Sequence, residues 1–207
     1  MNDQRRAVRD AYDEIAPAYD AERRSVAAPE QSMVADLAER LPEDAHVLDA
    51  GCGAGVPITT TLLEHVDVTG VDFSGVQLRM AADRAADAPF VQGDVTALPF
   101  GSNVFDAVVS FFTIIHVPWE GQLDCALEFH RVCRAGAPVL LTVGTEDWEG
   151  TNDDWIGAGA EMQWSMPGPK RAIGLLDEAG FTIQGQARYV DPVGDEEGEM
   201  VVIQARA

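Results

Sequence analysis

Three glycines at alternating positions follow a short apolar segment, and this feature constrains the fold more than any other. Residues 47–50 read Val-Leu-Asp-Ala, and Gly51, Gly53 and Gly55 follow directly. Glycine tolerates positive φ and lets a ligand approach the backbone closely. A helix is expected to begin near Pro57, with its first amides pointing at the same place. The pattern predicts a strand, turn and helix that hold a nucleotide-like ligand. Glycines alone also suit a tight turn without a ligand.

The spacing of these glycines distinguishes two kinds of ligand. A dinucleotide-binding loop reads Gly-x-Gly-x-x-Gly, but position 56 of this chain is Val. Asp49 precedes the loop, where its charge would repel a pyrophosphate and attract a cation. S-adenosylmethionine (SAM) carries an ammonium and a sulfonium but no phosphate. The loop resembles the first motif of the class I SAM-dependent methyltransferases, Asp/Glu-x-Gly-x-Gly-x-Gly. That resemblance implies that SAM contacts Asp49, Gly51, Gly53 and Gly55.

Segments with helix and strand character alternate along the chain. The expected helices are residues 4–24, 29–41, 57–64, 74–86, 120–133 and 169–179, and the expected strands are residues 46–50, 67–71, 90–93, 105–110, 137–143, 181–190 and 199–206. This alternation predicts an α/β, doubly wound, Rossmann-like sheet with its ligand at the carboxyl ends of the strands. The last turn is too short for a helical crossover. We therefore expect seven strands, mostly parallel, with an antiparallel C-terminal strand.

The length of 207 residues suits one core, so a single domain is expected over residues 1–207. Residues 1–41 would form an N-terminal helical cap. An irregular, tryptophan-rich segment, residues 145–167, would form a lid on the substrate side. The N-terminus lacks an apolar signal core, and the longest apolar run is too short to span a membrane. Three cysteines without disulfide or metal-ligand spacing indicate a reduced, cytoplasmic setting.

The charge balance is strongly acidic. The chain has 35 acidic and 14 basic residues, and Lys170 is its only lysine. Net charge of this size destabilises a compact chain by self-repulsion, and salt screens that repulsion. We therefore expect a halophilic protein adapted to a salt-rich cytoplasm. The same charge argues, though weakly, against nucleic acid as a partner, because nucleic-acid binding needs basic patches.

Further candidate ligand-binding residues follow the second and third strands. Asp72 stands 21 residues after the first glycine, an interval that suits an acid accepting from both ribose hydroxyls. An acid before a helix also favours the helix dipole. Phe73 is expected against adenine or in the core. By resemblance to the family, Asp94 accepts from the adenine amino group and Val95 supplies a backbone amide. The alternative for Asp94 is a turn residue bonded to its own backbone.

Two tyrosines near the N-terminus carry a more local resemblance. Residues 12–20 read Tyr-Asp-Glu-Ile-Ala-Pro-Ala-Tyr-Asp. This segment is similar to the start of many small-molecule methyltransferases, including the quinone-biosynthesis C-methyltransferases, in which it folds over the cofactor. The resemblance implies that Tyr12 and Tyr19 cover the methionine end of SAM. Two aromatic residues that anchor an amphipathic helix would give the same pattern.

Residues beyond the fourth and fifth strands are candidates for the acceptor side of the site. Ser110 and Phe111 lie at the carboxyl end of the fourth strand and are expected to face the cofactor. His116 follows that strand, and an unperturbed histidine titrates near pH 6.5, which suits a general base. A histidine that only lines the pocket is the alternative. Trp155 and Trp164 are expected to contact an apolar or planar acceptor, or to close on the core of the protein itself. No metal is expected, because the chain shows no clustered carboxylates of the magnesium-binding kind.

The sequence thus predicts a SAM-dependent methyltransferase acting on a small-molecule methyl acceptor. A SAM-binding protein without transferase activity remains open, since no residue is an unambiguous catalyst. A nicotinamide-dependent oxidoreductase or epimerase on a similar sheet fits less well. The short-chain type of that class needs a Tyr-x-x-x-Lys pair, and position 166, four residues before Lys170, is Met.

Overall fold

The computed structural model describes residues 3–25, 29–193 and 198–207. Seven strands form one sheet in the order β3-β2-β1-β4-β5-β9-β8. They are β1 (His46–Ala50), β2 (Asp67–Asp72), β3 (Phe90–Gln92), β4 (Ala107–Ser110), β5 (Pro138–Gly144), β8 (Thr182–Asp191) and β9 (Gly198–Arg206). The five strands from β3 to β5 are parallel, and β9 is antiparallel to both neighbours. This confirms the expected seven-stranded sheet with its antiparallel C-terminal strand.

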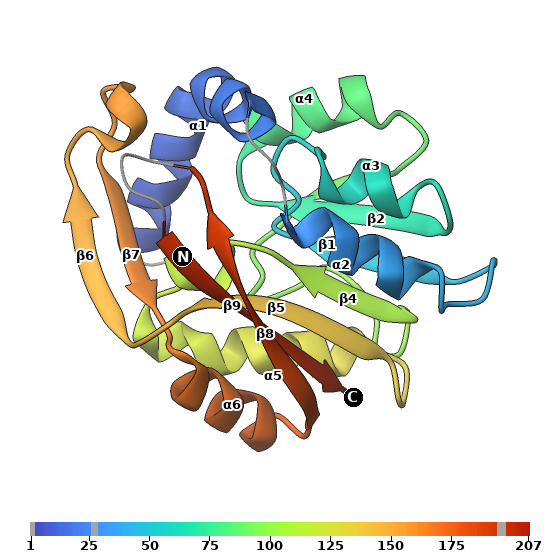
Figure 1. The fold of residues 1–207 in the computed structure, drawn as a ribbon. Helices are drawn as coiled ribbons and strands as arrows, with labels where there is room; N and C mark the ends of the chain where they lie inside the picture. Colours follow the sequence, from blue (N-terminus) through green and yellow to red (C-terminus); the bar gives the residue numbers. More distant parts are fainter. Residues whose placement is uncertain (1–2, 26–28, 194–197) are drawn as a thin grey trace.

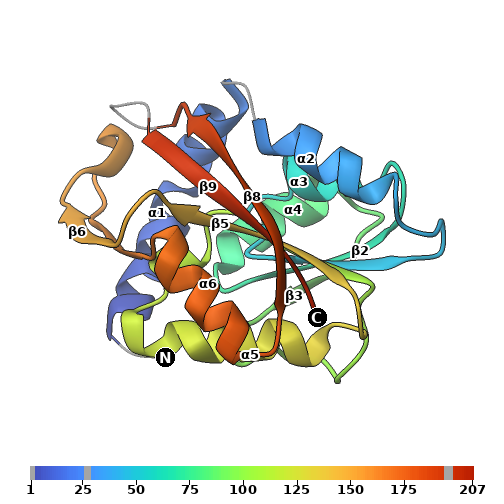
Figure 2. The same cartoon turned by 60° about the horizontal axis from the view of Figure 1, so that its bottom comes forward.

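Helices cover both faces of this sheet (Figures 1 and 2). One face carries α2 (Pro29–Ala38), α3 (Ile58–Leu62) and α4 (Gly75–Arg84), and the other carries α5 (Gln122–Val132) and α6 (Pro169–Glu178). The long N-terminal helix α1 (Asp3–Ser25) lies outside these layers, beyond the carboxyl ends of the central strands. Its buried residues recur at helical spacing, so one stripe of α1 faces the protein: Val8, Ala11, Tyr12, Ile15 and Ala16.

The chain reverses its direction of travel across the sheet beside β1. From β1 it moves outward through β2 to β3, and it then returns to place β4 on the other side of β1. Strands β1 and β4 are almost completely buried, which accounts for their apolar sequences. Open α/β sheets bind ligands at such a reversal, outside the carboxyl ends of the strands. The glycine loop leaves β1 at this point.

The tryptophan-rich segment is a β-hairpin, so the expectation of an irregular segment over residues 145–167 is wrong. Strands β6 (Trp148–Asn152) and β7 (Met162–Met166) pair antiparallel, apart from the main sheet. The register sets Trp148 opposite Met166 and Gly150 opposite Trp164. Large side chains therefore gather on one face of the hairpin, and cross-strand pairs of this kind stabilise strands whose own sequence favours them little. Figure 1 shows the hairpin beside α1.

Other boundaries differ from the expected ones by a few residues. The fourth strand begins at Ala107, and α5 begins at Gln122 after a short 3₁₀ turn, Trp119–Gly121. Much of the expected turn between the last two strands, residues 194–197, lies outside the described residues. Within the described residues, no helix has the length and apolar character needed to cross a membrane.

Candidate active site

The glycine loop brings backbone amides to the carboxyl ends of β1 and β2. Gly51 has φ of +81°, and its amide donates to the Val71 carbonyl at 2.7 Å. A Cβ at Gly51 would lie 1.9 Å from the Thr113 hydroxyl oxygen, so only glycine fits here. Gly53 has φ of +52°, and its amide donates to the Asp72 carboxylate at 2.9 Å. The loop and the acid at the end of β2 therefore hold each other in place.

Two buried acids, Asp49 and Asp72, lie beside this loop. Asp49 accepts a 2.6 Å hydrogen bond from the Thr59 hydroxyl. Asp72 accepts from the amides of Gly53 and Ser74. Burial raises the pKa of Asp49 to about 7, although the Thr59 hydrogen bond opposes the rise. Burial also raises the pKa of Asp72 to about 6, against the two amides. Within the described residues neither acid has an ion-pair partner, so a cationic ligand would stabilise both charges.

A cavity opens between this loop and α1. It encloses about 1040 Å³ of space, including its opening to solvent. It brings together ten of the expected site residues: Tyr12, Tyr19, Asp49, Gly51, Gly53, Asp72, Phe73, Asp94, Val95 and His116.

Four expected site residues do not line the cavity: Gly55, Ser110, Trp155 and Trp164. Gly55 is packed behind the loop, where an added Cβ would lie 3.2 Å from the Cβ of Ala81. The expectation for Ser110 is corrected, because its fully buried hydroxyl donates to the Ala50 carbonyl at 2.9 Å. Side chains alternate along a strand, and it is the next residue, Phe111, that reaches the cavity.

The two tryptophans form a second layer behind the cavity. The ring of Trp155 lies 5.3 Å from that of Tyr19 and 6.0 Å from that of Tyr12, between ring centroids. The ring of Trp164 lies 5.8 Å from that of His116. Each tryptophan thus packs against a cavity-lining ring, and neither lines the cavity itself.

His116 joins three segments that are distant in sequence. Its Nδ1 lies 2.9 Å from the Gln163 carbonyl oxygen, and its Nε2 lies 3.0 Å from the Tyr12 hydroxyl. A carbonyl only accepts, so Nδ1 carries the proton and Nε2 accepts from Tyr12. Burial lowers the pKa of His116 to about 4. Burial also raises the pKa of Tyr12 well above its usual value. The pair is therefore uncharged at neutral pH.

Asp94 is engaged on both carboxylate oxygens. Oδ1 accepts from the amide of Thr96 at 3.0 Å and from its hydroxyl at 2.8 Å, which is the expected turn arrangement. Oδ2 accepts from the guanidinium of Arg5 at 2.8 Å. Arg5 belongs to α1, and both residues line the cavity, so this ion pair ties α1 to the cavity wall.

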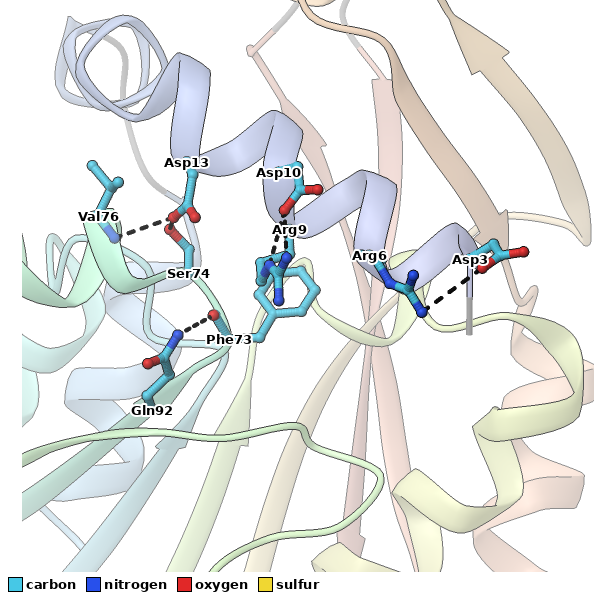
Figure 3. A network of polar contacts seen from close by, with 9 residues as sticks. All are labelled: Asp3, Arg6, Arg9, Asp10, Asp13, Phe73, Ser74, Val76 and Gln92. Atoms are coloured by element: carbon cyan, nitrogen blue, oxygen red, sulfur yellow. Dashed lines mark hydrogen bonds and ion pairs between the residues drawn. The ribbon is translucent and has the colours of Figure 1, made fainter. Parts of the chain in front are cut away.

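Polar contacts that were not predicted attach α1 to the site. Asp13 of α1 accepts from the Ser74 hydroxyl at 2.6 Å and from the Val76 amide at 3.1 Å, so it helps to cap α4 (Figure 3). Asp20 pairs with Arg84 of α4, and Arg23 pairs with Asp191 at the end of β8. Residues 12–20 contain the pair Tyr-Asp twice, and its acids, Asp13 and Asp20, were the one signal in the sequence for such contacts. Long-range pairs of this kind leave no periodic signal.

Within the described residues, no three His, Cys, Asp or Glu side chains are grouped so that they could hold a metal ion. Buried acids, aromatic rings, Arg5 and Arg23 line the cavity.

Comparison with known proteins gives a consistent family. The methyltransferase-domain family matches residues 47–136. A malonyl-[acyl-carrier protein] O-methyltransferase from Pseudescherichia vulneris is 34% identical over 67% of this chain and 53% of the relative. A demethylmenaquinone methyltransferase from Renibacterium salmoninarum is 33% identical over 63% and 55%. A tRNA (carboxymethyluridine(34)-5-O)-methyltransferase from Arabidopsis thaliana is 27% identical over 77% and 41%. The chain thus spans about half the length of the curated relatives it matches.

Solved structures show the same fold. The crystal structure of a SAM-dependent methyltransferase from Methanosarcina mazei superposes with a TM-score of 0.73 at 23% identity. The match covers 81% of this chain and 94% of that one. The strand order, the glycine loop and these similarities together show that the chain belongs to the class I SAM-dependent methyltransferase family.

Proposed function

We propose that this protein binds SAM and transfers its methyl group to a small molecule. One observation carries the proposal: Asp49 and Asp72 are buried beside the glycine loop without a described ion-pair partner. Burying an acid in this way is costly unless a cation or hydrogen-bond donors compensate it. SAM supplies two cationic groups and a ribose with two hydroxyl donors. The site therefore matches SAM in charge and in hydrogen bonding.

The cavity residues support one orientation of the cofactor. Asp72 would accept from the ribose hydroxyls, because a carboxylate has about four acceptor positions and two amides use only part of them. Phe73, Asp94 and Val95 would hold adenine beside the ion pair between Asp94 and Arg5. Asp49 would face the cationic groups near the glycine loop. Tyr12 and Tyr19 of α1 would cover the methionine end.

Methyl transfer needs orientation more than it needs acid–base chemistry. SAM, when bound, supplies a methyl group that is already activated. The task of the protein is to hold an acceptor in line with that group, and orientation of this kind contributes roughly 7–11 kcal/mol. The Tyr12–His116 pair would position the acceptor as a neutral hydrogen-bonding unit. With a pKa near 4, His116 is a weak base at neutral pH.

The acceptor class is proposed from the relatives and the charge. Two relatives act, by name, on malonyl-[acyl-carrier protein] and demethylmenaquinone. A third acts on tRNA, so nucleic acid stays a candidate acceptor. The formal net charge of −21 disfavours it. A small molecule that fits between His116 and the ring of Phe111 is therefore the preferred acceptor.

Two measurements test this function. Isothermal titration with SAM and with NAD should show binding of SAM alone, and binding of NAD alone would favour a nicotinamide-dependent enzyme. A methyl-release assay across phenols, amines, thiols and quinones should then identify an acceptor. Tight SAM binding with no turnover on any class would favour a SAM-binding protein without transferase activity.

We further propose that the protein works in a salt-rich cytoplasm. The excess of acids supports this, because salt screens self-repulsion. Melting temperature should keep rising with KCl beyond the range in which simple screening saturates. A melting temperature that stays flat from about 0.1 M to above 1 M would contradict the proposal, since the Debye length shortens greatly over this span.

A further inference from the structure

A buried acid that the cofactor motifs do not explain lines the cavity near the end of α1. Glu30 is the second residue of α2, and its side chain is 2% exposed. Its Oε2 atom has no hydrogen-bond partner, and it is fully shielded from solvent. Its Oε1 atom lies 3.8 Å from the guanidinium of Arg23, which is too long for a hydrogen bond. Burial raises the pKa of Glu30, although a hydrogen bond from its own backbone amide and the charge of Arg23 oppose the rise. The carboxyl group is thus poorly satisfied inside a ligand cavity.

Arg23 cannot fully serve Glu30, because other groups already hold it. Its guanidinium donates to Asp191 at 2.7 Å and to the Tyr19 hydroxyl at 3.4 Å. It also lies 4.1 Å from the ring centroid of Phe112. Arg23, Glu30 and Asp191 together carry one positive and two negative charges. One negative charge is left in excess in a largely buried cluster, and a cation would compensate it.

We propose that the carboxylate of Glu30, fixed beside Arg23, binds an alkylammonium group in a subsite of this cavity by accepting its hydrogen bonds. An ammonium has three donors and one positive charge, which match the open oxygen and the excess charge. A ligand carboxylate would instead meet Glu30 and Asp191 and would have to displace Arg23 from its partners. The proposal rests on the proposed function only in treating this cavity as the active site. The ammonium has two possible sources: the methionine end of SAM or an amine on the acceptor.

The test compares Glu30→Gln with the matched control Glu39→Gln, which changes an exposed acid just beyond α2. Calorimetry measures the binding of S-adenosylhomocysteine, which has the ammonium, and of 5′-methylthioadenosine, which lacks it. Benzylamine and benzyl alcohol are then titrated with and without saturating S-adenosylhomocysteine. Thermal melting checks the fold. Glu30→Gln should melt no lower than the wild type, because it removes a poorly compensated buried charge. A Glu30 that served only to pair with Arg23 would give a lower melting temperature.

The outcomes separate the sources and can overturn the proposal. If Glu30→Gln weakens S-adenosylhomocysteine about tenfold or more and leaves methylthioadenosine unchanged, the ammonium is that of the cofactor. If both nucleosides are unaffected but the preference for benzylamine over benzyl alcohol disappears, the ammonium is that of the acceptor. Unchanged binding of all four probes would overturn the subsite. If the wild type binds neither nucleoside, the proposed function fails, and the benzylamine preference alone decides whether the subsite stands.

Discussion

Replacing Asp49 by Asn should remove part of the pH dependence of the unfolding free energy. Burial raises the pKa of Asp49 from 3.8 to about 7, so the folded state binds this proton more tightly than the unfolded state. The stability that this group contributes is present at low pH and is lost as pH rises toward 7. At 1.36 kcal/mol per pKa unit, the full loss approaches about 4 kcal/mol. Roughly 2–3 kcal/mol of it falls between pH 5 and pH 8.

Asn keeps the acceptor for the Thr59 hydroxyl but cannot ionise. The difference in unfolding free energy, Asp49→Asn minus wild type, should therefore grow by about 2–3 kcal/mol from pH 5 to pH 8. Urea unfolding of the ligand-free protein at several pH values measures this difference. Subtracting the wild-type curve removes the general repulsion of the acidic chain.

Asp106→Asn is the matched control with the opposite sign. Burial works against the Asp106 charge, but hydrogen bonds from Arg134 and the His46 amide outweigh it and lower the pKa. Its contribution is present at neutral pH and is lost as pH falls, so this variant should be destabilised at pH 7 and recover relative to the wild type in acid. Parallel pH profiles for the wild type and Asp49→Asn would refute the reasoning on Asp49.

SAM binding gives a second readout of the same group. A cation beside Asp49 would lower its pKa again, so binding near pH 6.5 should release a proton. The binding enthalpy would then depend on the ionisation enthalpy of the buffer, and Asp49→Asn would lack that part of the dependence. The same proton release in Asp49→Asn as in the wild type would assign the proton to another group, with Asp72 the next candidate.

Four further substitutions test the site. Asp72→Ala should weaken SAM binding about tenfold or more, because a charged hydrogen bond contributes roughly 1.5–3 kcal/mol; unchanged affinity in calorimetry would remove Asp72 from the site. Gly51→Ala should abolish SAM binding or folding, since its Cβ would collide with Thr113, and circular dichroism separates the two; normal affinity would contradict the loop geometry. His116→Ala and Trp164→Ala should leave SAM affinity nearly intact and lower turnover. Because the pKa of His116 is about 4, protonation of His116 should not lower the turnover of the wild type between pH 8 and pH 6. A fall in wild-type turnover over this range that is absent in His116→Ala would identify His116 as the base.

Local patterns account for the parts of the fold that the sequence predicted well. The bounds of β1 agree with prediction because an apolar run ends at a glycine turn. The helix expected over residues 74–86 begins where predicted, because Ser74 caps α4 by accepting from the amide of Gln77. The acids at strand ends fell in the cavity, because strand order and parallel direction bring such ends together.

Features that depend on long-range packing were not predicted. The hairpin at residues 148–166 forms through cross-strand pairs that its own sequence does not announce. Ser110 was misassigned because one step along a strand exchanges the two faces. Glu30 looks like an ordinary acid in a first helical turn, and only the tertiary contacts of α1 bury it. The contacts of Arg5 and Asp13 depend on the docking of α1 in the same way.

The two ends of the described chain lie toward opposite ends of the parallel strands, which matters for any fusion or surface attachment. Gln4 donates to the Ser165 hydroxyl of the hairpin, and Arg5 reaches Asp94 at the cavity. Ala207 instead exchanges backbone hydrogen bonds with Gly136 and Ala137, just before β5 begins. A bulky group joined ahead of α1 would lie close to the cavity, because Arg5 lines it. One joined after Ala207 would lie beside the start of β5, so immobilisation for binding measurements is better made at the C-terminal end.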